Sequence, residues 1–517
     1  MRTRNILFGI LASTAIVGLS AALYYLYHKY DEKSRQVESL QTQVKDLERQ
    51  EKQSAVMQSV NAQMEEIALQ ERRISDEQRE AAERQTVVAE RMRQHAEQER
   101  QNALEAEHRA VQASQTAESQ RRIAEDQRAA AEHSKRVADT LSYLTLSRQI
   151  GNYAITQYHD GNIVLANLLA YAAYQYTKRY GGDIYTPSVY QALVMTSQSK
   201  HQWTRHQGTV TDIAFFKKGP YSLASTSTYG ELLAHRFDSE QQLLTDTLYA
   251  NKSFDFRDLF IDHPSGTLFA VSRTGHLLIR KDGRTTIRTV EGIGRLMGIE
   301  PVGGQFIVIG EEGLTQLTPH SWHPDKTRRL SHKIMAISLF DGRPLLFDDH
   351  RQMLRLNSID DIPVQRVPVS GQVTAFASSK NTHVKTYGMA DGTIWMEDAQ
   401  GKMHKLLGHR SRVSRIKING ARIYSASYDG TVNLWMSNKE KIEPMSIIRT
   451  NGWLRCFTFD EKKHNLWCGD QKGTLTEAFI SVPLMTSKLQ KQLKRNLTHD
   501  EWSYYIGRNI PYEAFTK

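Results

Sequence analysis

Cysteine is almost absent from this sequence of 517 residues, which contains only Cys456 and Cys468. Two cysteines cannot build a disulfide framework or a zinc site with four thiolate ligands. Both lie in one predicted group of strands, where the common interpretation is two small buried residues. The alternative is a cross-strand disulfide, which requires an exported domain.

Motifs of the common enzyme classes are missing as well. The sequence has no convincing glycine-rich phosphate loop, no HExxH or GxSxG motif, and no Cys and His cluster with the spacing of metal ligands. We therefore expect a protein that is not an enzyme and that has no catalytic residue, no cofactor and no metal site.

Proline and glycine are absent between residues 31 and 139, where Glu, Gln, Arg, Ala and Lys dominate. This composition predicts one long helix or coiled coil over residues 31–140. Alanine recurs at every seventh position from Ala82 to Ala138, a period typical of supercoiled helices. An alanine seam buries little area, so self-association should be weak, and a solvated single helix is the alternative. In either case the segment is a spacer that offers a possible homo-oligomer contact.

One long run without charge covers residues 6–27, after a short flank of residues 1–5. Its length and its closing tyrosines predict a single transmembrane helix. A cleaved signal peptide is the competing interpretation, because small residues at 20–22 offer a cleavage point.

Residues 141–199 combine apolar residues at helical spacing with two glycine-containing breaks, near residues 159–161 and 181–183. They predict a bundle of three short helices. The tyrosines in this segment are interpreted as packing surface rather than as a ligand site.

Residues 407–435 carry the clearest pattern of the chain, LGHRSRVSRIKINGARIYSASYDGTVNLW. A Gly-His pair comes first, and then three stretches at strand period surround an Asp-Gly turn and end in Trp435. This pattern resembles one blade of a WD40 β-propeller.

The resemblance implies a hydrogen-bonded set that fixes the strand register of the blade. Its members would be His409, Ser425 or Ser427, Asp429 and Trp435. Buried polar groups that satisfy one another in this way are structural, so we do not interpret them as an active site.

Seven units with a strand, turn and strand rhythm follow one another between residues 201 and 480. They predict an all-β, seven-bladed WD40 propeller. The units span residues 206–237, 256–280, 295–317, 334–356, 373–395, 413–435 and 453–479. Only the fifth and sixth keep both the Asp-Gly turn and a Trp, so the other blades should lack the polar network. We expect residues 201–206 to supply the outer strand of the last blade.

Residues 484–517 are predicted to form a short helical tail, with a capping box from Thr498 to Glu501. The tail sequence RNLTHDEW resembles segments that follow propellers in bacterial WD40 proteins. Residues 165–172 and 190–193 resemble the helical adaptor that precedes such propellers. In those proteins the arrangement often accompanies a STAND-type NTPase or a caspase-like domain, and no motif of either is present in these residues.

The resemblance and the apolar run together predict a bacterial membrane-anchored protein of the inner, cytoplasmic membrane with a single pass. Basic residues on both sides of the run give almost no preference for orientation. The very short N-terminal flank favours a location of the bulk in the periplasm.

The candidate partner-binding residues are Arg410, Arg412, Trp453 and Arg455, in loops between blades. Arginine and tryptophan are enriched at protein interfaces. Residues 201–480 contain 36 Lys or Arg and 29 Asp or Glu, which favours an acidic protein partner. Nucleic acid is not an expected partner, because basic and aromatic residues do not alternate along one face.

The sequence thus predicts a membrane-tethered interaction scaffold or sensor. One alternative is a structural strut of the cell envelope that acts through coiled-coil oligomerisation. A second is a propeller enzyme whose active site lies in the central channel, built from side chains of several blades.

Overall fold

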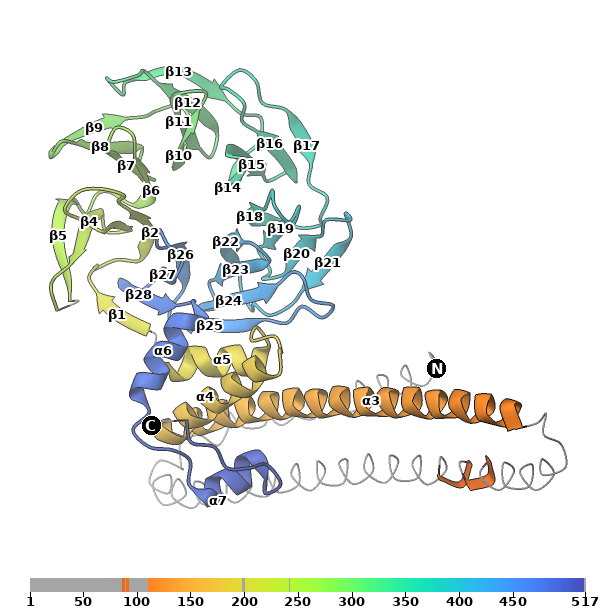
Figure 1. The fold of residues 1–517 in the computed structure, drawn as a ribbon. Coiled ribbons are helices and arrows are strands. Elements are labelled where there is room, and N and C mark those ends of the chain that lie inside the picture. The colour runs from red at the N-terminus through yellow and green to blue at the C-terminus, as the bar shows by residue number, and fades with distance from the viewer. Residues whose placement is uncertain (1–85, 89, 93–109, 198–199, 241, 516–517) are drawn as a thin grey trace, which may run out of the picture. The chain divides into compact units, whose positions relative to one another are not determined.

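A computed structural model describes residues 86–88, 90–92, 110–197, 200–240 and 242–515 (Figure 1). The chain divides into two compact units, residues 1–129 and 130–517. The predicted anchor at 6–27, its flank and most of the predicted coiled coil lie outside the described residues. Within the described ranges, no helix is both long enough and apolar enough to span a bilayer.

The long helix α3 (Ala110–His159) starts in the first unit and ends in the second. From residue 118 to 136 every side chain is exposed, and Arg121 forms an ion pair with Glu125 one turn away. Earlier in the first unit Val88 and Met92 are also exposed. A solvated helix is therefore observed, and pairing of two such helices stays a prediction.

The second unit contains the C-terminal end of α3, α4 (Ile163–Arg179) and α5 (Pro187–Thr196). Three helices were predicted here, but the first is the end of a 50-residue helix rather than a short one. Gly151 explains how α3 continues and still packs closely. A Cβ atom at this position would lie 2.7 Å from the carbonyl oxygen of Ser188 at the start of α5.

The tail consists of α6 (Val482–Gln492), α7 (His499–Trp502) and a π-helical turn at Ser503–Gly507. The capping box predicted at Thr498 and Glu501 is present in both directions. Tyr512 donates a hydrogen bond to the carbonyl of Leu497, at 2.7 Å, which folds the end of the chain back onto the tail.

Seven four-stranded antiparallel sheets make the propeller, which confirms the predicted seven blades (Figure 1). Blade one contains β2 (Val210–Phe215), β3 (Leu223–Ser227), β4 (Glu231–Phe237) and β5 (Leu243–Ala250). Blade two contains β6 (Phe256–Asp262), β7 (Thr267–Ser272), β8 (His276–Lys281) and β9 (Arg284–Thr289). Blade three contains β10 (Leu296–Val302), β11 (Gln305–Gly310), β12 (Gly313–Leu317) and β13 (Pro324–Arg329). Blades four and five contain β14 (Ile334–Phe340), β15 (Arg343–Asp348), β16 (Gln352–Arg355) and β17 (Val364–Arg366); and β18 (Val373–Ser378), β19 (Lys385–Met389), β20 (Ile394–Glu397) and β21 (Met403–Leu406).

Blade six contains β22 (Val413–Asn419), β23 (Arg422–Ser427), β24 (Thr431–Met436) and β25 (Met445–Arg449). Blade seven contains β26 (Leu454–Phe459), β27 (Asn465–Asp470), β28 (Thr474–Phe479) and, as its outer strand, β1 (Lys200–Thr204). β1 pairs with β28 from Lys200 opposite Ala478 to Thr204 opposite Thr474, which confirms the expected closure of the ring. Trp203 of β1 also stacks on Trp467, with ring centroids 5.4 Å apart. The two ends of the domain are thereby joined in one sheet.

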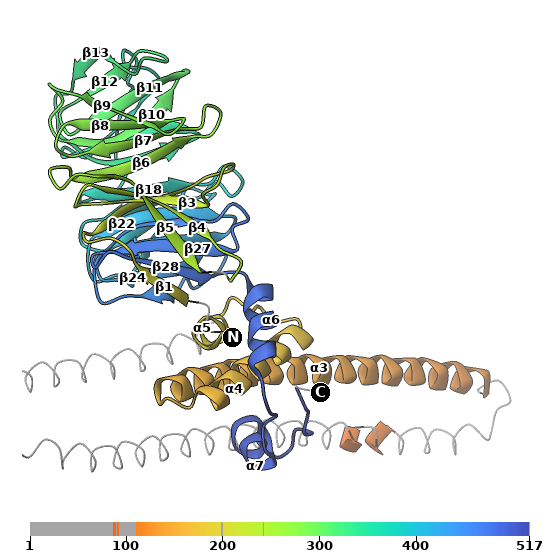
Figure 2. The same ribbon diagram turned by 90° about the vertical axis from the view of Figure 1, so that its left-hand side faces the viewer.

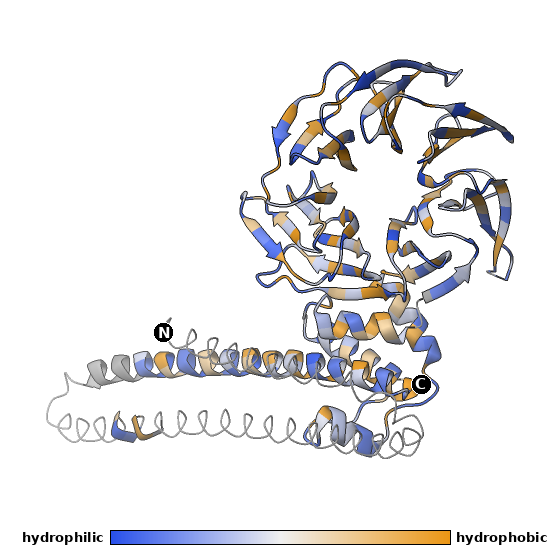
Figure 3. Ribbon diagram, turned by 180° about the vertical axis from the view of Figure 1, so that it is seen from behind, coloured by the Kyte–Doolittle hydropathy of each residue, from blue (hydrophilic) through white to orange (hydrophobic). Residues whose placement is uncertain are grey.

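The hydrophobic core lies between neighbouring blades rather than inside each sheet. One cluster joins Phe269 of blade two to Ile299 and Val308 of blade three. Figure 3 shows hydrophobic and hydrophilic residues alternating along many strands, as this packing requires. A single blade would leave this surface uncovered, so neighbouring blades stabilise one another.

The two cysteines are both buried and unbonded, so the disulfide alternative is wrong. Cys456 lies opposite Gly469, while Cys468 lies opposite Phe457. Successive residues of a strand point to opposite faces, so the two sulfur atoms lie on different faces of the sheet.

Helices of the second unit pack against the outer edge of blades six and seven (Figures 1 and 2). Tyr190 of α5 donates a hydrogen bond to the carbonyl of Ile480 at 3.2 Å. Arg422 donates to the hydroxyl of Tyr185 at 3.1 Å, and Lys439 forms an ion pair with Asp183. These contacts lie at the end of blade six where β22 connects to β23, and along the outer strand of the blade, β25.

Candidate functional site

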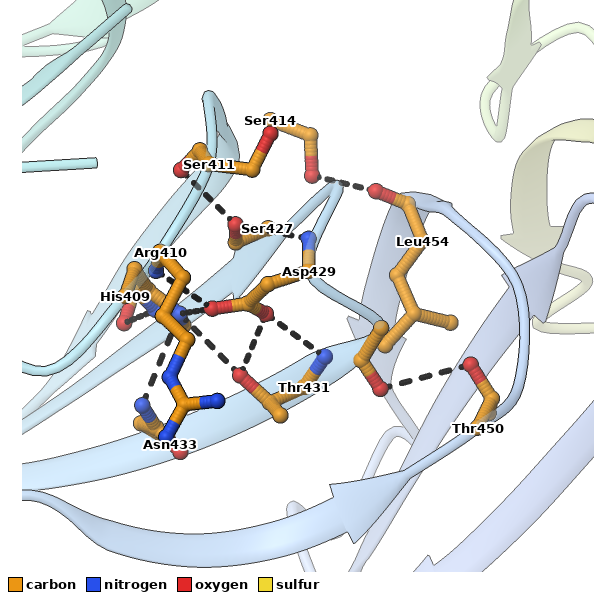
Figure 4. A network of polar contacts seen from close by, with 12 residues as sticks. His409, Arg410, Ser411, Ser414, Ser427, Asp429, Thr431, Asn433, Thr450 and Leu454 are labelled. Carbon is orange, nitrogen blue, oxygen red and sulfur yellow. Dashed lines mark hydrogen bonds and ion pairs between the residues drawn. The ribbon is translucent and has the colours of Figure 1, made fainter. Parts of the chain in front are cut away.

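The polar network of blade six connects the loop before β22 to the turn after β23 (Figure 4). His409 Nε2 lies 2.7 Å from Ser425 Oγ, and His409 Nδ1 lies 3.0 Å from Asp429 Oδ2. Trp435 donates its indole N–H to the same Ser425 oxygen, also at 2.7 Å. Ser425 is thus the serine that joins the network.

Ser427, the other candidate serine, has a different role. Its hydroxyl donates to the carbonyl of Ser411 at 2.9 Å and accepts the backbone N–H of Asp429. It therefore holds the loop against the turn without touching His409.

Burial of this network leaves no access for a substrate. The His409 side chain has no exposed surface, and that of Asp429 is 9% exposed. Burial acts to raise the pKa of Asp429, but hydrogen bonds from His409 and Thr431 outweigh it and hold that pKa well below its usual range. A carboxylate held in this way accepts hydrogen bonds and does not exchange protons near neutral pH, so it orients the turn.

Blade one contains the same network with different residues, so the prediction that degenerate blades lack it is wrong for this blade. Ser225 Oγ lies 2.7 Å from both His206 Nε2 and His235 Nε2. Glu231 takes the part of the turn aspartate, with its Oε2 3.1 Å from His206 Nδ1. Glu231 lies two residues after the position of blade one that corresponds to Asp429. Its side chain is longer than that of aspartate by one methylene group and still reaches His206.

Blade five keeps an Asp-Gly turn and a tryptophan, but its tryptophan does not occupy the network position, so the expected complete motif is wrong for this blade. Trp435 lies opposite Ile423 in blade six, and the residue at the equivalent place in blade five is Glu397, opposite Lys385. Trp395 precedes this place by two residues. An ion pair of 2.8 Å between Lys385 and Glu397 replaces the network.

The four candidate partner-binding residues lie at the end of blades six and seven that is opposite to the Arg422 turn. We call it the Trp453 end. Trp453 is 52% exposed and stacks on Tyr428, with ring centroids 5.4 Å apart and planes 7° apart. Arg455 donates to the Tyr428 hydroxyl through Nε and Nη2, at 3.3 and 3.2 Å. These three side chains form one rigid aromatic and cationic group.

Arg410 and Arg412 extend the basic surface beside this group. Arg410 is exposed and its backbone N–H donates to Asp429 at 2.9 Å (Figure 4). Among the residues that the structure describes, neither guanidinium forms an ion pair with an acid. Arg449 and Lys472, which are also exposed, lie at the same end of their strands.

Charged residues also meet on the inner strands around the centre of the ring, which the sequence did not reveal. The strand registers place one residue of each blade at a common level, directly after the bulge of the inner strand: Asp212, Asp258, Gly298, Ala336, Ala375, Arg415 and Cys456. Two residues further on, Glu300 of blade three and Lys417 of blade six lie at a second common level. The strand registers reveal this common level only when the registers of all seven blades are compared.

Three of the charged side chains connect one blade to another. Asp212 of blade one accepts the backbone N–H of Leu259 in blade two at 3.4 Å, and Asp258 of blade two accepts that of Ile299 in blade three at 3.0 Å. Arg415 of blade six reaches past Cys456 in blade seven and donates to Asp212 at 2.6 Å. The carboxylates therefore satisfy inner-strand N–H groups that face a neighbouring blade.

Burial and neighbouring charges shift the pKa values of this cluster. Burial, and then the negative charge of Asp212, raise the pKa of Asp258. Burial and the charges of Asp258 and Asp212 raise the pKa of Glu300 to about 8. Burial and then Arg415 lower the pKa of Lys417 to about 8, and its amine donates to Thr458 at 3.0 Å. Hydrogen bonds between blades explain the presence of most of these charged groups, so a catalytic role is not needed to explain them.

Comparison with known proteins identifies a WD40 repeat in blade six. A family model described as "WD domain, G-beta repeat" matches residues 401–436. No curated protein matches the chain in sequence. Among solved structures, the "Crystal structure of WD40 beta propeller domain of Doa1" is similar with a TM-score of 0.46 and 14% identity, covering 55% of this chain and 97% of that one. This chain contains a WD40 repeat within a seven-bladed β-propeller, a fold that typically serves as a platform for protein interactions.

Proposed function

We propose that this protein is a membrane-tethered interaction scaffold that holds an acidic protein partner at the Trp453 end of its propeller. The observation that carries the proposal is the rigid group of Trp453, Tyr428 and Arg455, flanked by the guanidinium groups of Arg410 and Arg412, which form no ion pair within the part of the chain that the structure describes. Exposed tryptophan and arginine in a fixed arrangement bind with little loss of side-chain entropy.

The position of the helices supports this assignment. They contact Arg422, Lys439 and Ile480, at the other end and outer edge of blades six and seven. Among the described helices of the second unit, the contacts therefore lie away from the Trp453 end. The helical spacer at residues 31–140 and the apolar run at 6–27 would hold that end at a distance from a bilayer.

Charge reversal tests the binding surface directly. The full chain with Arg410→Glu and Arg412→Glu should capture the partner from a lysate of the source cells at least about tenfold less well than the unchanged chain. The matched control is Lys217→Glu with Lys218→Glu, which reverses two exposed lysines in the turn at the opposite end of blade one. Equal capture by both variants would reject the surface.

Membrane tethering is tested separately. The unchanged chain should sediment with membranes and require detergent for release, whereas a chain that starts at residue 31 should not. We propose that the bulk lies in the periplasm, so a reporter fused after Lys517 that is active only outside the cytoplasm should give signal. No signal from this reporter, together with a signal from one that is active only in the cytoplasm, would reject the periplasmic location and leave the binding surface untouched.

The envelope strut is a second candidate, favoured by the exposed apolar residues Val88, Met92 and Ile123 of the first unit. In a coiled coil these side chains would be covered by a second helix. Light scattering on residues 31–140 at high micromolar concentration tests this role, and a strict monomer would reject it.

A further inference from the structure

Three potential metal ligands lie close together in blade four, at the end of the blade that corresponds to the Trp453 end of blades six and seven. His332 lies in the loop before β14, and Asp349 and His350 lie in the turn between β15 and β16. One ligand atom from each of these residues lies within 4.8 Å of the other two. The sequence predicted no metal site, because the two segments are separated by an entire hairpin.

Comparison with blade six explains why these side chains are available. The registers place His350 at the position of Asp429 and Leu346 at the position of Ser425. Leu346 offers no hydroxyl, so blade four cannot form the buried network. His332 is partly exposed and His350 exposed, and across the described residues neither imidazole forms a hydrogen bond or an ion pair.

The backbone around the cluster is well fixed. Asp348 is buried, and its Oδ1 accepts the backbone N–H groups of His350 at 3.0 Å and Gln352 at 2.7 Å. Asp349 Oδ1 accepts the backbone N–H of Lys333 at 3.2 Å, which joins the turn to the loop. The other oxygen of Asp348 is buried and has no hydrogen-bond partner among the described residues.

The two imidazole rings already lie against each other. Their centroids are 3.9 Å apart, with planes inclined by 33°. The nearby ammonium of Lys333 is directed to Glu312, 3.5 Å away, rather than to the cluster.

We propose that His332, Asp349 and His350 bind a divalent transition-metal ion, with zinc as the preferred ion. Two imidazole nitrogens and one carboxylate oxygen form a donor set that zinc accepts, at about 2.0–2.2 Å from the metal. Two ligand atoms of a tetrahedral zinc ion lie about 3.3 Å apart, which small side-chain rotations achieve from the present arrangement. The fourth position stays open to water or to a side chain of a partner.

Zinc titration of the full chain by calorimetry tests the site. The unchanged protein should bind zinc at this site, and His332→Asn or His350→Asn should each weaken that binding by at least about tenfold. The control is the pair His320→Asn and His383→Asn, two exposed histidines outside the cluster. Both have positive φ, which asparagine tolerates.

Visible spectroscopy gives a second measurement that does not depend on the number of other zinc sites. Cobalt bound to the unchanged protein should give the intense d–d bands of a low-symmetry nitrogen and oxygen site, and Asp349→Asn should reduce them. The proposal is overturned if the cluster variants and the control variant bind zinc alike, or if cobalt spectra are the same in all of them. Melting temperatures measured without metal check that each variant is folded.

Discussion

The indole of Trp453 stacks on the phenol ring of Tyr428 with an angle of 7° between the ring planes, although the two residues belong to different blades. Arg455 then bonds to the hydroxyl of the same tyrosine. A residue that is 52% exposed would ordinarily sample several rotamers, but these contacts hold it in one. The surface is consequently ordered before any partner binds.

Trp453→Ala should weaken binding of the protein partner by about 2 kcal/mol, or about 30-fold, because a pre-ordered tryptophan is a typical interface anchor. Surface plasmon resonance with the captured partner would measure the change. Tyr229→Ala is the control, since this 49% exposed aromatic lies in the turn of blade one that corresponds to the Tyr428 turn of blade six. Similar losses in both variants would show that the effect is not specific to the Trp453 group.

Ser425→Ala should destabilise the propeller by about 1–3 kcal/mol, because it leaves the buried indole N–H of Trp435 without an acceptor. Denaturant unfolding followed by tryptophan fluorescence measures the free energy of unfolding. Ser437→Ala is a suitable comparison, since that partly exposed hydroxyl donates only to the carbonyl of Ala421. A Ser425→Ala variant no less stable than Ser437→Ala would contradict the role assigned to the network.

Glu231→Gln should destabilise the protein at pH 7 and much less near pH 2. Burial acts to raise the pKa of Glu231, but hydrogen bonds from His206, Ser227 and the backbone of Gln207 outweigh it and lower that pKa to about 2. The unfolded value is about 4.3, so the stabilisation is complete above it and is lost as pH falls through the folded value.

Melting temperatures between pH 2 and 7 measure the difference for Glu231→Gln. The control is Glu240→Gln, at an exposed position near the end of β4. A difference between Glu231→Gln and the unchanged protein that stays constant with pH would refute the assignment.

Glu300→Gln should have the opposite pH dependence. The folded-state pKa of Glu300 is about 8, well above the unfolded value, so the folded state holds a proton that the unfolded state releases. The stability of the unchanged protein should therefore decrease as pH rises from about 4.5 to 8. The amide variant cannot ionise, so its melting temperature should exceed that of the unchanged protein increasingly over this range. Parallel curves would contradict the prediction, and Glu291→Gln, at an exposed position, serves as the control.

Local sequence was sufficient for the propeller because each blade carries its own pattern. Strand alternation and turn residues depend on neighbours along the chain, and the number of blades followed from counting such units. Closure by β1 was predictable as well, since blade seven lacked an outer strand. The helix break near Gly161 and the capping box at Thr498 are equally local signals.

Register between strands was harder to predict. Trp395 and Trp435 both follow an Asp-Gly turn, but they lie two residues apart when the strand pairs are aligned. Glu231 and His235 replace Asp and Trp in blade one, and only their distances to Ser225 and His206 identify them as members of the same network.

The sequence by itself determined the helical class of residues 141–199 and of the tail, the count of seven blades and the loops that hold Arg410, Arg412 and Trp453, because these depend on periodicity and on turn chemistry. The tertiary structure alone decided which distant side chains meet. It brought Asp212, Asp258 and Arg415 to one level of the ring, and His332, Asp349 and His350 to one end of blade four. The reason is that ring closure sets the contacts between blades and strand pairing sets those within a blade, and no local pattern records either.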